Sequence, residues 1–166
     1  GDPDLITIKG RKAIEEADMI IYAGSLVSED HLNYKKDSCV CYNSAKMHLE
    51  EVLDLMIEGD RKDLNIVRLH TGDPSIYGAI KEQMDPLEAL GIDFEVIPGV
   101  SSFVAAAASI KKEFTLPGVS QTVILTRIKG RTDVPETENL ESLASHGASM
   151  ALFLSVGHME KVLDAL

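Results

Sequence analysis

The sequence alternates between short apolar runs and segments in which apolar residues recur at helical spacing. In residues 48–59, for example, Leu49, Val52 and Met56 fall on one helical face. The same pattern predicts helices at 48–59, 75–90 and 101–110, and strands at 18–24, 38–43, 65–71 and 93–99. Alternating strands and helices favour a largely parallel sheet covered by helices on both faces. The predicted fold class is therefore α/β.

Two of the predicted helices carry further expectations. Proline removes a backbone donor, so the helix at 75–90 is expected to bend or break near Pro86. The Ala-rich segment 101–110 is expected to be a buried helix, because small side chains permit close packing on neighbouring elements.

The pattern restarts after a stretch that contains Pro117 and Gly118. Strands are predicted at 122–128 and 149–156, and a helix is predicted after each. Two strands are too few for an independently stable sheet, so this part is expected to begin a second α/β domain that is incomplete here. The predicted organisation is an N-terminal domain over 1–114 without its first strand, a linker over 115–120, and a truncated C-terminal domain over 121–166.

Charge and cysteine content argue against several classes of protein. The formal net charge is −11, and phosphate backbones bind clustered Lys and Arg, so nucleic acid is not the expected partner. No apolar run approaches the ~20 residues of a membrane span, and we expect neither a span nor a secretory signal. Cys39 and Cys41 are interpreted as reduced thiols, which predicts a cytoplasmic protein. The scattered histidines predict no metal site.

Three turns follow predicted strands and precede helical segments. They contain Ser25, the stretch Thr71-Gly72-Asp73-Pro74, and the pair Ser101-Ser102. Such turns can form one rim at the carboxyl ends of parallel strands, where open α/β sheets bind ligands. From local sequence, Asp73 is either a helix cap or a ligand contact, and the same alternatives apply to the two serines.

A cluster of basic residues stands out in this acidic chain. It comprises Arg127, Lys129 and Arg131. Guanidinium groups bind carboxylates through paired hydrogen bonds. The cluster is therefore either a solvated loop or a site for an anionic ligand.

The chain resembles the tetrapyrrole methylase family over essentially its whole length. The resemblance rests on the ordered motifs "GDPDLITIKG", "YAGSLVSEDHL", "VRLHTGDPSIYGAIKEQM", "VIPGVSSFVAAAAS" and "QTVILTRIKGR". It implies two α/β domains with S-adenosylmethionine bound in a cleft between them, and S-adenosylhomocysteine as product. The implied activity is methyl transfer to a corrin precursor, with carbon 11 of precorrin-4 or cobalt-precorrin-4 as the expected position. The alternatives are methylation of another ring carbon or of uroporphyrinogen III, and a non-catalytic α/β binding module.

The resemblance also implies site residues and partners. The implied cofactor contacts are Thr71, Gly72, Asp73, Ile76, Ser101, Ser102 and Leu154. The anionic tetrapyrrole substrate is expected to meet Ser25, Arg127 and Arg131. Family members are commonly dimeric, so a homodimer is expected. No catalytic residue is assigned, because a methyl displacement requires chiefly that the reacting atoms be held in line.

Overall fold

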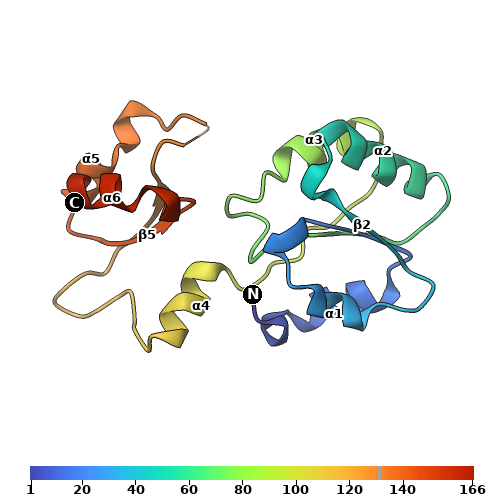
Figure 1. The fold of residues 1–166 in the computed structure, drawn as a ribbon, viewed down its shortest axis with the longest axis horizontal. Coiled ribbons are helices and arrows are strands. Elements are labelled where there is room, and N and C mark those ends of the chain that lie inside the picture. The colour runs from blue at the N-terminus through green and yellow to red at the C-terminus, as the bar shows by residue number, and fades with distance from the viewer. Residues whose placement is uncertain (131) are drawn as a thin grey trace. The chain divides into compact units, whose positions relative to one another are not determined.

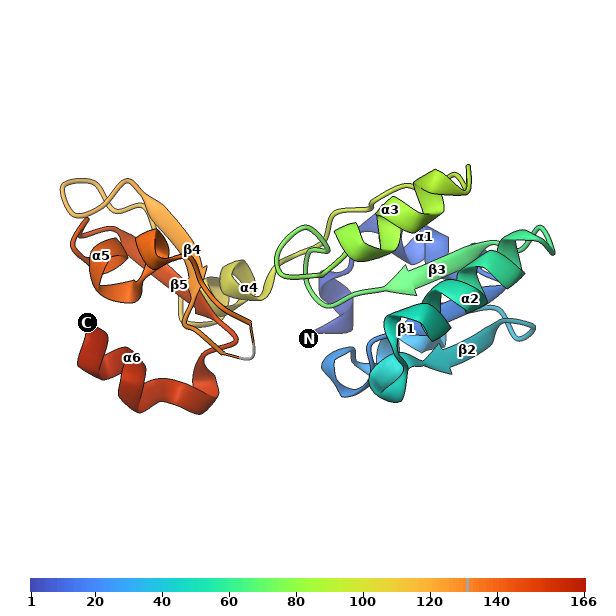
Figure 2. The ribbon, with the colours of Figure 1, turned by 90° about the horizontal axis from the view of Figure 1, so that it is seen from above.

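The computed structural model describes residues 1–130 and 132–166, except for the side chain of Ser25. The chain divides into two compact units, Gly1–Val104 and Ala105–Leu166, which Figures 1 and 2 show as ribbons. The domain limits expected at residues 114 and 121 stay a prediction.

A three-stranded parallel sheet forms the centre of the first unit (Figure 2). Strand β1 (Met19–Tyr22) lies between β2 (Val40–Asn43) and β3 (Ile66–Leu69). The register pairs Met19 with Val40 on one side and with Ile66 on the other. The parallel pairing predicted from the alternation of strands and helices is confirmed in this sheet.

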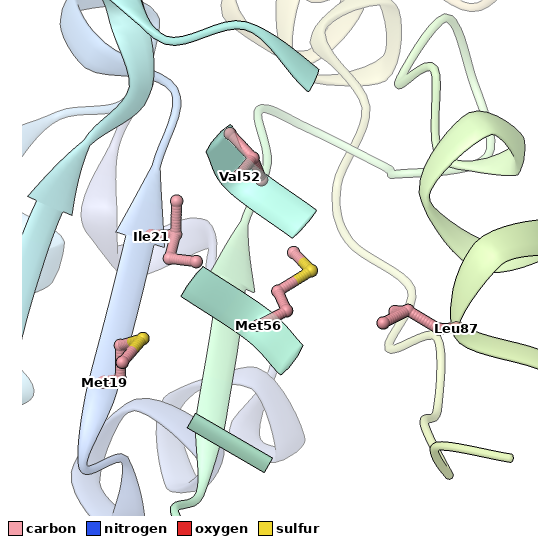
Figure 3. Close-up of a cluster of buried hydrophobic side chains, with 5 residues drawn as sticks. All are labelled: Met19, Ile21, Val52, Met56 and Leu87. Atoms are coloured by element: carbon pink, nitrogen blue, oxygen red, sulfur yellow. The ribbon is translucent and has the colours of Figure 1, made fainter. Parts of the chain in front are cut away.

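The side chains of β1 alternate between two hydrophobic cores. Met19 and Ile21 belong to a cluster with residues of α2 (Leu49–Asp60) and α3 (Lys81–Ala89), which Figure 3 shows. Ile20 packs on the opposite side with Ile14 of α1 (Ile8–Glu16). Successive strand residues point to opposite faces. The central strand is therefore buried on both faces, as expected for a parallel sheet.

Short 3-10 helices make many of the connections. They span Pro3–Leu5, Gly24–Leu26, Glu29–Tyr34, Ser44–Lys46, Glu136–Glu138 and Val156–His158. No helix formed by the described residues is long and apolar enough to cross a bilayer.

The second unit contains a pair of parallel strands, β4 (Val123–Arg127) and β5 (Ser149–Phe153). Helix α5 (Leu140–Ala144) connects the two strands, and α6 (Met159–Ala165) follows β5. Leu140 and Val162 are the buried residues of these helices. Helix α4 (Ser102–Ser109) begins in the first unit and ends in the second.

The helix predicted for 75–90 begins only at Lys81, so its first part was wrongly predicted. Tyr77 and Ala79 have φ angles of 54° and 49°, in the left-handed region that a right-handed helix excludes. A break at Pro86 is also wrong, because α3 continues through Pro86 to Ala89, whereas a bend there stays a prediction. The carbonyl that Pro86 leaves without a helical donor belongs to Glu82, an exposed residue that water can reach.

Two more local predictions are wrong. Residues 93–99 form no strand with any of the residues that the structure describes. An apolar run indicates strand propensity, but a strand also requires a neighbour to pair with its backbone. Helix α4 contains no buried residue, although 101–110 was predicted to be buried. Its small side chains permit close packing but do not by themselves provide a packing partner.

Candidate functional site

Polar bonds join the carboxyl ends of the three strands in the first unit. Ser44, which follows β2, donates from Oγ to the carbonyl oxygen of Tyr22 at the end of β1 over 3.0 Å. Arg68 of β3 donates from Nη1 to Ser44 Oγ over 3.0 Å and to the carbonyl oxygen of Ile21 over 3.1 Å. These bonds fix the edge of the sheet at which α/β proteins bind ligands.

The two segments predicted to contact the cofactor, 71–76 and 101–102, lie against each other. Gly72 has a φ of +58°, and a Cβ added to it would lie 3.2 Å from Cα of Ser101. A Cβ added to Gly99 would lie 2.1 Å from the carbonyl oxygen of Gly72, which is a steric overlap. The absence of side chains at Gly72 and Gly99 therefore permits backbone-to-backbone contact between the two loops.

Asp73 is bonded within and across these loops. One carboxylate oxygen accepts from the backbone N–H of Gly99 over 3.0 Å. The other accepts from the backbone N–H of Ser75 over 2.9 Å and from the Ser75 hydroxyl. The bond from the Ser75 hydroxyl, and then that from Gly99, holds the pKa of Asp73 below its usual value. Asp73 is not the cap of α3, whose N-cap is Ile80, so its carboxylate joins two loops instead.

The loop continues through a strained turn before α3 begins. Tyr77 and Ala79 are both left-handed. Such non-glycine conformations cost about 1–3 kcal/mol each and persist where surrounding structure holds them. Gln83 of α3 is 8% exposed and donates from Nε2 to the carbonyl oxygen of Ala79 over 3.1 Å. Its Oε1 accepts from Nε of Arg68 over 3.1 Å.

Sequence reasoning missed Arg68 and Gln83. Arg68 stands in the otherwise apolar run "NIVRL", and that position was the available signal. Gln83 has no local signature, because its role depends on groups in β3 and in the turn.

His70 follows β3 and precedes the candidate loop. Burial, and then the charge of Arg68, lowers the pKa of His70 to about 4. Its imidazole is therefore neutral at pH 7. Cys39 and Cys41 are free thiols, and burial raises the pKa of Cys39 to about 11. Within residues 1–130 and 132–166 no group of three His, Cys, Asp or Glu side chains could hold a metal ion.

Leu154 directly follows β5 in the second unit. It has a φ of 54° and is 76% exposed, an unusual combination for a large apolar residue. The neighbouring Ser155 is 2% exposed and donates from Oγ to the carbonyl oxygen of Phe153 over 2.7 Å. Ser155 Oγ also accepts from the backbone N–H of Ile128 over 3.3 Å. Ser155 thus links the ends of β4 and β5 beside Leu154, a role that sequence reasoning did not identify.

Arg127 is the last residue of β4, and its guanidinium binds the loop that follows. It donates to the carbonyl oxygens of Thr132 over 3.0 Å and Asp133 over 2.7 Å. Lys129 pairs with the Asp133 carboxylate over 2.7 Å in the same loop. Arg127 is therefore held in place by backbone carbonyls.

The predicted site residues do not all lie in one unit, and some of them lie outside the part of the chain that the structure describes. The structure brings segments 71–76 and 101–102 together in the first unit, whereas Leu154 and Arg127 belong to the second. Arg131 and the side chain of Ser25 lie outside the described residues.

Comparison with known proteins gives consistent matches over the whole chain. The profile of the family described as Tetrapyrrole (Corrin/Porphyrin) Methylases matches residues 1–166. The chain is 61% identical over 166 residues to the cobalt-precorrin-4 C(11)-methyltransferase of Methanocaldococcus jannaschii. It is 46% identical over 166 residues to the precorrin-4 C(11)-methyltransferase of Pseudomonas aeruginosa. These matches cover 100% of this chain but 64% and 66% of the two relatives' lengths.

A solved structure supports the same relationship. The X-ray structure of a cobalt precorrin-4 methyltransferase, a cobalamin biosynthetic enzyme, matches with a TM-score of 0.96 and 50% sequence identity. The match covers 99% of this chain and 69% of that chain.

Proposed function

Because the chain belongs to the tetrapyrrole methylase family, we propose that the intact protein methylates carbon 11 of cobalt-precorrin-4 or precorrin-4 in cobalamin biosynthesis. The names of the relatives at 61% and 46% identity support this ring position. The observation that carries the site is the backbone contact between Gly72 and Gly99, which joins two loops at the carboxyl edge of the sheet.

We assign S-adenosylmethionine to this joined edge, with S-adenosylhomocysteine as product. The proposed contacts are Thr71, Gly72, Asp73, Ile76, Ser101, Ser102 and Leu154. Thr71 and Gly72 are exposed, so their backbone groups are open to a ligand. The bond from the backbone N–H of Gly99 to Asp73 holds the two loops together. The residues present fit a polar cofactor that binds to backbone groups of the loops. They do not form a pocket of charged side chains.

The cofactor supplies a methyl group that its sulfonium makes electrophilic. The work left to the protein is to hold carbon, methyl and sulfur in line and to exclude water. Positioning of this kind can lower a barrier by roughly 7–11 kcal/mol. The carbonyl network around the guanidinium of Arg127 gives that side chain a fixed orientation. We propose that Arg127, with Arg131 and Ser25, binds the anionic tetrapyrrole.

Two properties of the intact protein complete the proposal. We place it in the cytoplasm, which the free thiols Cys39 and Cys41 support. We also propose a homodimer, following the resemblance to the family, and sedimentation velocity of the intact protein would measure its mass in solution.

Methylation with isotope-labelled cofactor tests the proposed reaction. The intact protein would be incubated with S-adenosylmethionine carrying a ¹³C methyl group, and separately with precorrin-4 and cobalt-precorrin-4. The expected product is heavier by one methyl group, and carbon NMR should place the label on carbon 11. A label on another ring carbon would indicate a sibling methylase. Comparison of the methylation rates with precorrin-4 and with cobalt-precorrin-4 identifies the preferred substrate. If the intact protein fails to bind S-adenosylhomocysteine in a calorimetric titration, the alternative of a non-catalytic binding module is left.

A further inference from the structure

We propose that Gln83, anchored by Arg68, is a positioning residue that sets the conformation of loop 71–80 for the cofactor. The inference rests on the proposed function, because it assigns a purpose to a buried amide behind the proposed cofactor loop. Gln83 itself is 8% exposed, so it acts through the loop and not by touching the ligand.

The guanidinium of Arg68 is fixed by neutral acceptors. It donates to the carbonyl oxygen of Ile21, to Ser44 Oγ and to Gln83 Oε1 over 3.0 to 3.1 Å. In the part of the chain that the structure describes, no carboxylate lies within ion-pair distance of Arg68. The strand ends therefore hold Arg68 rigidly, and its orientation does not depend on a mobile acidic side chain.

Arg68 determines which way the amide of Gln83 faces. A guanidinium only donates hydrogen bonds, so the amide oxygen must face Arg68. The NH₂ group is then left to donate to the carbonyl oxygen of Ala79. The chain of bonds thus runs from the sheet edge, through Arg68 and Gln83, to the end of the loop.

The loop needs such a support because its backbone is strained. Tyr77 and Ala79 are left-handed, and none of the described residues from 71 to 80 belongs to a helix or strand. Asp73 fixes the beginning of the loop to Gly99. Gln83 fixes its end at Ala79, so both ends of the proposed cofactor loop are held by side chains.

Substitution Gln83→Glu separates positioning from general stability. The carboxylate keeps the shape of the amide and still accepts from Arg68, but it cannot donate to the carbonyl of Ala79. In the intact protein we expect about tenfold weaker binding of S-adenosylhomocysteine by calorimetry, with a Tm within a few degrees of the wild type. The KM for S-adenosylmethionine should rise while kcat at saturating cofactor is retained. A purely structural role would lower Tm and active fraction together and leave the affinity of the folded protein unchanged.

The matched control is Gln121→Glu, the same chemical change at an exposed site. It should bind S-adenosylhomocysteine as the wild type does. If Gln83→Glu does not fold, Gln83→Met removes both hydrogen bonds without adding a charge and should also weaken binding. Wild-type affinity in a folded Gln83 variant overturns the positioning role alone. Absence of binding by the wild type overturns the proposed function and this inference together.

Discussion

Gly99 and Gly72 approach so closely that a single methyl group decides whether their loops can touch. In the intact protein, Gly99→Ala would place Cβ 2.1 Å from the carbonyl oxygen of Gly72. The loops must then separate, which breaks the bond from Gly99 to Asp73. We expect the affinity for S-adenosylhomocysteine to fall at least about tenfold in a calorimetric titration.

Gly157→Ala is the control for this prediction. A Cβ at Gly157 would have no atom within 4 Å, and its φ is not in the left-handed region. This variant should bind S-adenosylhomocysteine as the wild type does. Equal affinity in both variants would show that the contact between the loops does not matter for binding.

Arg127 carries a second prediction at the residue scale. If its guanidinium binds carboxylates of the tetrapyrrole, Arg127→Ala should raise the KM for the substrate several-fold more than it lowers kcat. Steady-state kinetics at saturating S-adenosylmethionine would measure the two effects. The control is Arg61→Ala, an exposed arginine after α2. Normal substrate kinetics in the Arg127 variant would remove this residue from the substrate site.

The residue-scale features that sequence predicted are those with a local signature. Gly72 could be recognised as a glycine that follows a predicted strand. Asp73 could be recognised as an acidic residue in the turn after that strand. The partner Gly99 was not identified, because it meets Asp73 across a separation of 26 residues. Gln83 escaped for the same reason, since its partners Arg68 and Ala79 lie in two other segments.

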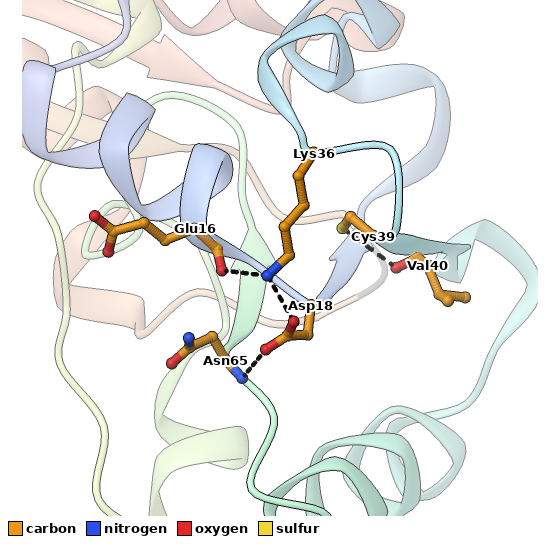
Figure 4. A network of polar contacts seen from close by, with 6 residues as sticks. All are labelled: Glu16, Asp18, Lys36, Cys39, Val40 and Asn65. Atoms are coloured by element: carbon orange, nitrogen blue, oxygen red, sulfur yellow. Dashed lines mark hydrogen bonds and ion pairs between the residues drawn. The ribbon is translucent and has the colours of Figure 1, made fainter.

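At the element scale, Asp18 joins the starts of all three strands of the first unit (Figure 4). Its carboxylate accepts from Nζ of Lys36, before β2, over 2.6 Å. It also accepts from the backbone N–H of Asn65, before β3, over 2.9 Å. The bond from Lys36, and then that from Asn65, holds the pKa of Asp18 below its usual value. We therefore expect Asp18→Asn to lower the Tm of the intact protein by a few degrees at pH 7.

The pH dependence of this loss has a definite sign. A carboxyl group whose pKa is lower in the folded state stabilises the fold above its unfolded pKa, about 3.9. That stabilisation disappears as the pH falls through the folded pKa. The difference in Tm between wild type and Asp18→Asn should therefore be largest near neutrality and shrink below about pH 4. The control is Asp93→Asn at an exposed site, which should show no such difference in Tm from the wild type. A Tm difference between wild type and Asp18→Asn that does not change with pH would contradict the role of Asp18.

Helices and strands could be predicted from the sequence where the residues of a single segment determine its structure. The alternation of Met19, Ile20 and Ile21 between two cores follows from strand geometry, and β1 was found as expected. The spacing of apolar residues at 75–80 fits a helix and predicts one, whereas a bond from Ser75 to Asp73 and one from Gln83 to Ala79 hold the turn that forms there. Residues 93–99 show the converse case, in which apolar content is present but strand pairing is absent among the described residues.

At the scale of the whole molecule, the stretch between α4 and β4 in the second unit is the expected site of proteolysis. From 110 to 122 the described residues form no helix and no strand of more than a single bridge. Ile110, Leu116 and Val119 in this stretch are 66%, 43% and 75% exposed. Exposed segments without regular structure are the first to be cleaved. Thermolysin, which cuts before large apolar residues, should therefore cleave the intact protein first at these positions, as mass spectrometry of the fragments would reveal.

The cofactor should change the rate of that cleavage. Its proposed contacts lie in both units, at 71–76 and 101–102 in the first and at Leu154 in the second. Binding that orders the second unit through Leu154 reduces the flexibility that a protease needs in the exposed stretch. Saturating S-adenosylhomocysteine should thus slow cleavage between 110 and 120 in the wild type, and Leu154→Ala should weaken this protection. If the ligand binds but leaves the rate unchanged, Leu154 is not part of the cofactor site.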